Sequence, residues 1–100
     1  MHEFCLHLLC PPAAEEQLLD SLLGSAANEV FTSTQVQRHG MASARLSAAE
    51  QVLGSSRSVH LQVLLGKEEL QRLLAMLQRD FAGAGIRYWV SPIAFEGEIK

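Results

Sequence analysis

The 100-residue chain contains little of what indicates several familiar classes of protein. Two cysteines are too few for a disulfide scaffold, and reduced thiols are the ordinary state of cysteine in the cytoplasm. The eight basic residues form no cluster and the net charge is −3, so the basic surface of a protein that binds nucleic acid or anionic membranes is missing. No apolar run approaches the roughly 20 residues that span a bilayer, and Met1-His2-Glu3 is not the basic start of a signal peptide. These absences predict a small cytoplasmic protein that binds no nucleic acid and inserts in no membrane.

What the chain does have is a high hydrophobic content, 48%, in regular patterns. Period-two alternation predicts four β-strands, at residues 3–9, 29–37, 57–65 and 86–93. Leucines at helical spacing predict two helices, at residues 13–24 and 67–81. The order β-α-β-β-α-β predicts an α+β two-layer sandwich of ferredoxin-like topology, with both helices on one side of an antiparallel sheet. We expect a single domain over 1–100, in which 94–100 is a short strand or a tail.

The other side of the predicted sheet is apolar although no helix is expected to cover it. By alternation, its residues are Cys5, His7, Leu9, Phe31, His60, Gln62, Leu64, Trp89 and Ile93. Large exposed apolar patches usually mark surfaces of association, and aromatic side chains are enriched in interface cores. The sequence therefore predicts a homo-oligomer that buries this face, with Trp89 as an anchor of the interface.

Candidate metal ligands lie on the same predicted face. Cys5 and His7 are expected about 7 Å apart along one strand, and His60 about 5 Å away on the next. Thiolate and imidazole are ligands of Cu⁺ and Zn²⁺, so the three residues could hold either ion. The alternative is that they only pack in an interface, because the spacing matches no closed metal motif such as CxxC. His39, followed by Gly40, is a further candidate, either as a ligand or beside a hinge at a subunit boundary.

The link between the second and third predicted strands, residues 38–56, is far longer than a simple hairpin turn and is therefore expected to be functional. Within it, Ser47-x-x-Glu50 predicts a capped helical turn that Gly54 ends. No residues indicate catalysis, because the serines lack a neighbouring base and Cys5 lies in mid-strand, where nothing lowers the pKa of its thiol. A binding protein is favoured over an enzyme.

The element order and the segments FTSTQVQRHG, AAEQVLG and IRYWVSPIAFEGEI resemble the PII-like (GlnB-like) superfamily, to which the CutA proteins are related. The resemblance covers essentially the whole chain and is to a bacterial branch associated with heavy-metal efflux systems. It implies a trimeric signalling or ligand-binding protein whose loop, here residues 38–56, contacts a partner. In this branch, the partner implied is a membrane transport or efflux protein.

The resemblance also implies a ligand site in the cleft between subunits, at the base of the loop and at the glycine-rich turn before the fourth strand. The residues at these places are Arg38, His39, Gly40, Gly83, Gly85 and Arg87. PII proteins carry a basic residue directly after that turn, whereas Ile86 stands here, and their arginine-rich C-terminal segment has no counterpart in SPIAFEGEIK. These departures argue against adenine nucleotide as the cofactor, so the sequence leaves the cofactor unidentified, with copper or zinc as candidates from the cysteine and histidines above.

Overall fold

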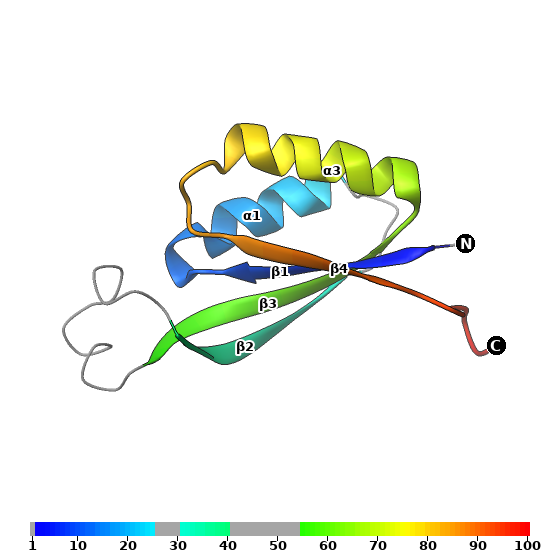
Figure 1. The fold of residues 1–100 in the computed structure, drawn as a ribbon, viewed down its shortest axis with the longest axis horizontal. Coiled ribbons are helices and arrows are strands. Elements are labelled where there is room, and N and C mark those ends of the chain that lie inside the picture. Colours follow the sequence, from blue (N-terminus) through cyan, green and yellow to red (C-terminus); the bar gives the residue numbers. More distant parts are fainter. Residues whose placement is uncertain (1, 26–30, 41–54) are drawn as a thin grey trace.

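The computed structural model describes residues 2–25, 31–40 and 55–100. The strands within these ranges are β1 (Phe4–Cys10), β2 (Phe31–His39), β3 (Ser55–Leu65) and β4 (Arg87–Pro92). The helices are α1 (Pro12–Ser25) and α3 (Lys67–Asp80), and both lie on one side of the sheet (Figure 1). This is the predicted α+β sandwich of ferredoxin-like topology. No helix in the described part of the chain is long and apolar enough to cross a membrane.

The sheet has the strand order β2-β3-β1-β4, and every pairing is antiparallel. β1 and β3 are therefore central, and β2 and β4 form the two edges. Because neighbouring strands run in opposite directions, the ends of β1 and β2 and the starts of β3 and β4 lie at the same end of the sheet. In Figure 1 this is the left-hand end.

The core lies between the sheet and the helices. β1 contributes Leu6, Leu8 and Cys10, which alternate along the strand and face buried residues of β3 and of both helices. The buried residues from the other elements are Leu18, Leu22, Val59, Leu61, Val63, Leu65, Leu70, Leu73 and Leu77. Pro12 is the first residue of α1, where its missing N–H costs no hydrogen bond, so β1 passes directly into a helix.

Most element ends differ from the prediction by one or two residues, and two of these shifts, together with one side-chain direction, concern the candidate site. β2 extends to His39 and β3 begins at Ser55, so Arg38 and His39 pair with β3 instead of opening a loop. Phe31 was predicted on the open face, and this is wrong. It pairs with buried Val63 and packs against the core, because the strand register sets it on the helix side. The predicted capped turn over 47–54 lies outside the described residues.

The glycine-rich segment after α3 reverses the chain into β4. Gly83 and Gly85 adopt φ of 80° and 81°, a region that side chains disfavour, and the Ala84 N–H donates to the Phe81 carbonyl at 3.1 Å. Gly85 also lies so close to Pro11 that a Cβ there would be 3.3 Å from the proline Cγ. The glycines thus have a structural role at the end of a helix.

The chain after β4 runs on as a tail, residues 93–100, without forming the additional strand considered from the sequence. Its first residue still follows the sheet, since the Ile93 N–H donates to the Glu3 carbonyl at 3.0 Å. The Glu96 carboxylate then accepts the backbone N–H of His2 at 3.0 Å and contacts its Nδ1 at 2.9 Å. The tail is therefore attached to the start of the chain.

Candidate functional site

The sheet face that the helices leave uncovered, here called the open face, carries both histidines of the central strands. The register places on it Cys5, His7 and Leu9 of β1, His60, Gln62 and Leu64 of β3, Trp89 and Ser91 of β4, and Thr32, Thr34 and Val36 of β2. Trp89 is 46% exposed, and Cys5 is buried among its neighbours. The predicted members of this face lie in strands and on the expected side. The exceptions are Phe31, which is on the helix side, and Ile93, which follows the end of β4.

His7, His60 and Trp89 form one contact group, here called the imidazole–indole cluster. His7 pairs directly with Trp89 across β1 and β4, and their ring centroids are 5.1 Å apart with the planes at 9°. His60 lies diagonally from His7 on β3 and completes the group, with its ring centroid 5.5 Å from that of Trp89. Nδ1 of His7 is 3.0 Å from Nε2 of His60, and Nε2 of His7 is 3.2 Å from Ser91 Oγ.

The hydrogen bond between the imidazoles restricts their protonation. One nitrogen must donate and the other accept, so the bond cannot form when both rings carry two protons. Burial lowers the pKa of His7 below its ordinary value of 6.5, and the nearby charge of protonated His60 lowers it further. At neutral pH, His7 is therefore a polar but uncharged side chain of this face, and the ring nitrogens of the pair could bind a cation or a hydrogen-bonding group.

The predicted metal ligands are only partly brought together. His7 and His60 touch, whereas His39 lies at the end of edge strand β2 opposite Ser55. Over the ranges 2–25, 31–40 and 55–100, no three His, Cys, Asp or Glu residues are grouped as a metal site would require. Burial raises the pKa of the Cys5 thiol, and a hydrogen bond from the Val63 backbone opposes this shift only in part. Within the described residues, this face thus offers two adjacent imidazoles and not a set of three or more ligands.

The residues expected to line an inter-subunit cleft fall into two separate sets at the same end of the sheet. Arg38, His39 and Gly40 lie at the end of β2, and Gly40 has a φ of 82°. Gly83, Gly85 and Arg87 precede or begin β4, at the opposite edge. With two strands between them, the sets do not face a common space in one chain. A ligand in contact with both would be bound between copies.

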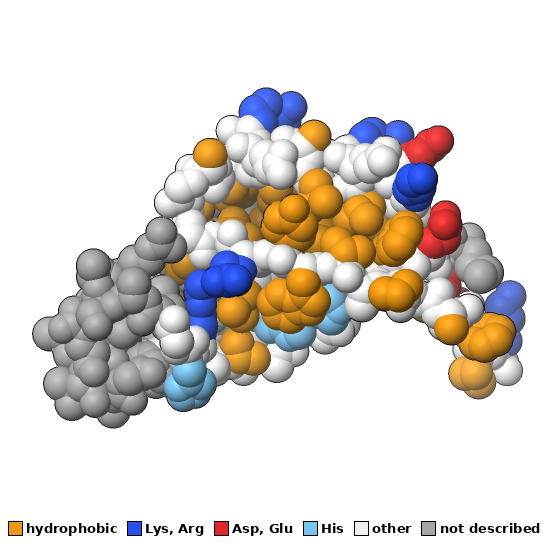
Figure 2. Space-filling view, viewed as in Figure 1, with side chains coloured by type: hydrophobic (Ala, Val, Ile, Leu, Met, Phe, Trp, Pro, Cys, Tyr) orange, Lys and Arg blue, Asp and Glu red, His pale blue; other side chains and the backbone are white. Residues whose placement is uncertain are grey.

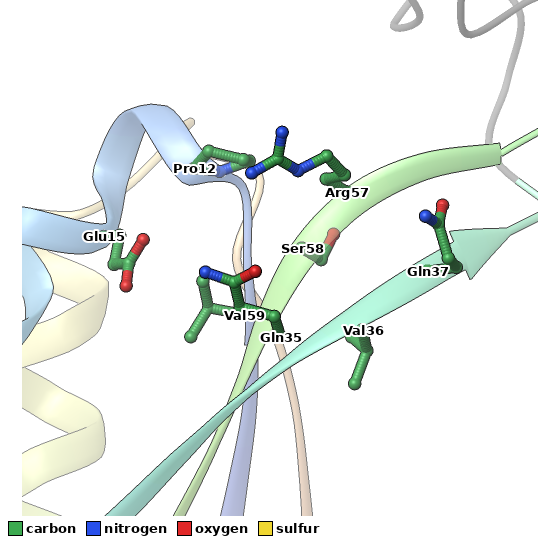
Figure 3. Close-up of a pocket in the computed structure, with 8 residues that line it drawn as sticks. All are labelled: Pro12, Glu15, Gln35, Val36, Gln37, Arg57, Ser58 and Val59. Atoms are coloured by element: carbon green, nitrogen blue, oxygen red, sulfur yellow. The ribbon is translucent and has the colours of Figure 1, made fainter.

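A pocket that the sequence did not reveal lies between the start of α1 and strands β2 and β3 (Figure 3). Its volume is about 260 Å³, and Gln35, Gln37, Arg57 and Glu15 give it a polar lining. Figure 3 shows Val36 on the opposite side of β2 from Gln35, as strand alternation requires. The alternating glutamines of β2 are the signal from which this polar edge could have been inferred.

A second depression, here called the apolar groove, runs between α3 and edge strand β4. It has a volume of about 190 Å³ and is lined mainly by Leu8, Leu74, Leu77, Phe81, Ile86 and Tyr88. Figure 2 shows hydrophobic side chains gathered in this seam between the helix layer and the edge strand. Because β4 is an edge, nothing in the described part of the chain closes the groove on its outer side.

Three solved structures share this fold along nearly their whole length. A DUF3240 family protein from Shewanella baltica superposes with a TM-score of 0.78 at 16% identity, covering 100% of this chain and 99% of that one. A nitrogen regulatory PII-like protein, CPII, from Thiomonas intermedia, bound to ADP, AMP and bicarbonate, gives 0.73 at 16% identity, with 99% and 98% covered. CutA1 from Pyrococcus horikoshii gives 0.71 at 7% identity, with 95% and 87% covered.

These likenesses, at 16% identity or less, establish the fold, which is the predicted fold of the PII-like and CutA proteins. The comparison with curated proteins finds no match. The sequence profile of one family matches the chain from residue 1 to residue 100. The chain therefore belongs to the DUF3240 family, described as proteins of unknown function, and has the fold of the PII-like and CutA proteins.

Proposed function

We propose that the chain is a non-catalytic regulatory or ligand-binding protein of the PII-like type that acts as a homo-oligomer, a trimer, with the open faces buried between copies. The open face carries this proposal. Trp89 is 46% exposed there, on the same face as Leu9, Leu64 and the His7–His60 pair. Exposed aromatic and aliphatic side chains in one continuous patch are typical of an association surface.

The ligand would be bound in clefts between copies, because Arg38, His39 and Gly40 lie at one edge of the sheet and Gly83, Gly85 and Arg87 at the other. CPII is bound to ADP, AMP and bicarbonate, so a cleft of this fold can accept nucleotides. In this chain Ile86 follows the glycine turn and the tail has no arginine, so adenine nucleotide is not the ligand we propose. The link between β2 and β3, predicted from the sequence as 38–56 and bounded in the structure by His39 and Ser55, would contact the partner, a membrane transport or efflux protein in heavy-metal resistance, from the cytoplasm.

Native mass spectrometry of the purified chain, supported by light scattering, tests the assembly and reports any retained ligand. We expect a trimer in the wild type and a monomer after Trp89→Glu, since a carboxylate in the buried patch would be unpaired. Leu23→Glu is the control, because Leu23 is an exposed apolar residue on α1, away from the open face. A wild-type monomer at micromolar concentration would exclude the proposal.

A second candidate function is a copper or zinc sensor or buffer, and the His7–His60 contact favours it. Two imidazole nitrogens 3.0 Å apart on one face are close enough to share an ion once the hydrogen bond between them is broken. Zn²⁺ usually takes four ligands, so Cys5, His39 or a second imidazole pair would have to come from another copy. CutA from Archaeoglobus fulgidus is described as a periplasmic divalent cation tolerance protein, which shows that this fold occurs in metal biology.

Calorimetric titration with Zn²⁺, and with Cu⁺ under reducing conditions, distinguishes the two candidates. If the metal is the ligand, His7→Ala and His60→Ala should each weaken binding by about tenfold or more, and Cys5→Ala or His39→Ala should reveal the remaining ligands. Unchanged metal affinity in His7→Ala, His60→Ala and His39→Ala would show that these histidines are structural. The result does not depend on whether a trimer forms, since the subunit count is measured separately.

A further inference from the structure

The tail has the sequence pattern of a β-strand but pairs with no strand of its own chain beyond Ile93. In IAFEGEIK, Ile93, Phe95 and Ile99 fall on one side of the alternation, and Glu96 and Glu98 fall on the other. Phe95 is 91% exposed and Ile99 is 99% exposed. An extended segment with one apolar side and one acidic side is suited to pair with a sheet edge that has the same polarity.

The tail is also held away from the body of its own chain. The Glu96 carboxylate binds His2, at the end of the sheet opposite to the glycine turn. In Figure 1 the tail projects from the right-hand end, and the hydrophobic side chains at that end in Figure 2 stand clear of the core. Phe95 and Ile99 thus stay exposed to solvent while Glu96 is hydrogen-bonded to His2.

The β4 edge, which borders the apolar groove, is complementary to the tail. Tyr88, which is 50% exposed, and Val90 face the helix side of β4, because they pair with buried Leu8 and Leu6. Arg87 faces the open side of the same strand, opposite Leu9. The β4 edge therefore presents an apolar groove on one side and a cation on the other, with its outward backbone groups available for pairing within the described structure.

We infer that the tail of one copy pairs with the β4 edge of a second copy, with Phe95 and Ile99 in the apolar groove and Glu98 on the side of Arg87. The edge strand β2 fits less well, because its helix-side positions after Phe31 are Ser33, Gln35 and Gln37. Both edges carry an arginine on the open side, Arg38 on β2 and Arg87 on β4, so it is the apolar side of the tail that selects β4. The tail and the groove are different surfaces, so the contact is head-to-tail, which is compatible with a closed ring of three copies.

The same chain cannot easily supply the occupant. The tail leaves β4 at Pro92, whereas the groove lies beside Gly85, Ile86 and Tyr88 at the other end of the strand. Six strand residues separate these ends by about 20 Å. To fold back, the tail would have to reverse direction and release Glu96 from His2. The inference rests on the self-association proposed above, but it concerns a different surface from the open face.

Disulfide trapping between two separately purified variants of the full chain tests the contact. Phe95→Cys and Gln78→Cys, on the rim of the groove, are mixed and mildly oxidised, and non-reducing electrophoresis measures covalent heterodimer. We expect at least tenfold more heterodimer than from Phe95→Cys mixed with the control Leu23→Cys on α1. The native cysteines do not interfere, because Cys5 and Cys10 are both buried.

The other outcomes are equally decisive. The inference is overturned if Phe95→Cys forms as much heterodimer with the control Leu23→Cys as with Gln78→Cys. It is also overturned if Gln78→Cys forms more heterodimer with Thr34→Cys, on β2, than with Phe95→Cys. A second measurement uses Phe95→Ser/Ile99→Ser, which should raise the dissociation constant between copies by about tenfold or more, while Leu23→Ser leaves it unchanged. A trimer that forms without trapping at residue 95 rejects the tail contact alone, whereas a wild-type monomer rejects the proposed function as well.

Discussion

The histidine pair shows how one hydrogen bond can determine the chemistry of a surface. Nδ1 of His7 and Nε2 of His60, on the two central strands, are 3.0 Å apart, and both rings contact the single tryptophan of the chain. Because burial and His60 both lower the pKa of His7, this imidazole is uncharged at neutral pH. An uncharged His7 can therefore be part of an association surface whose other members are apolar or neutral polar side chains, such as Trp89, Leu9 and Gln62.

The fluorescence of Trp89 should report the protonation of His7, which stacks on it. A charged imidazolium against the indole ring changes its emission, so a pH titration should show a transition with a midpoint below 6.5, the ordinary pKa of histidine. In His60→Gln the midpoint should move upward while staying below 6.5, because the charge repulsion is removed and burial remains. His39→Gln is the control and should leave the midpoint in place. A wild-type midpoint at or above 6.5 would contradict the geometry of the cluster.

Cys10 should make the folded state sensitive to alkaline pH. Burial, and then the negative charge of Glu15, raise the pKa of its thiol from 9.0 to about 11. The unfolded chain therefore ionises this thiol near pH 9, whereas the folded chain holds the proton until about pH 11. The stability contributed by the protonated thiol is fully present below pH 9 and is lost as the pH rises toward 11, by at most about 2–3 kcal/mol.

Urea unfolding at about pH 8 and pH 10.5 measures this loss. Cys10→Ala should be less stable than the wild type at the lower pH, because it leaves a cavity next to buried Leu8. Its stability should fall by less between the two pH values, because the titrating thiol is gone. Equal decreases in the two proteins would mean that the thiol is not protected by burial.

At the scale of elements, the turn between α3 and β4 depends on a backbone conformation. Gly85 has a φ of 81° and would bring a Cβ to 3.3 Å from Pro11, so Gly85→Ala should lower the free energy of unfolding by about 1–2 kcal/mol. Gly24→Ala is the matched comparison. Gly24 lies in α1 with no neighbouring atom within 4 Å of the added Cβ, and alanine there should stabilise by about 0.5–1 kcal/mol. Chemical denaturation measures both, and equal effects would show that the turn imposes no constraint.

The elements themselves could be predicted because their apolar residues follow two clear periods. The leucines of α3 recur at helical spacing, and Val59, Leu61, Val63 and Leu65 alternate along β3. β2 was harder. Its residues 32–35 are all polar, so alternation did not define which side faces the core, and Phe31 was assigned to the wrong one. The register with β3, a long-range property, is what places Phe31 on the helix side.

The candidate site, too, could be predicted only where it depends on local alternation and not on contacts between distant residues. Strand alternation was enough to place His7, His60 and Trp89 on one face, but it could not give the diagonal offset that joins His7 to His60 at 3.0 Å. The apolar groove and the polar pocket at α1 are formed by residues distant in sequence, such as Leu8 with Phe81 and Glu15 with Arg57. No local pattern encodes such contacts, because they result from how the layers pack.

At the scale of the whole molecule, the fold leaves the apolar side chains of the open face in contact with water. Their burial between copies should couple assembly to stability. Folding that includes association becomes dependent on protein concentration, since dilution favours the dissociated chain. A tenfold increase in concentration should therefore raise the thermal midpoint of the wild type by about 4 °C. In Trp89→Glu this dependence should disappear, because the carboxylate keeps the copies apart while lying on a surface that the monomer exposes. Leu23→Glu should retain the full dependence. Circular dichroism melts at several concentrations measure all three, and a wild-type midpoint that does not change with concentration would mean that the open face remains in water.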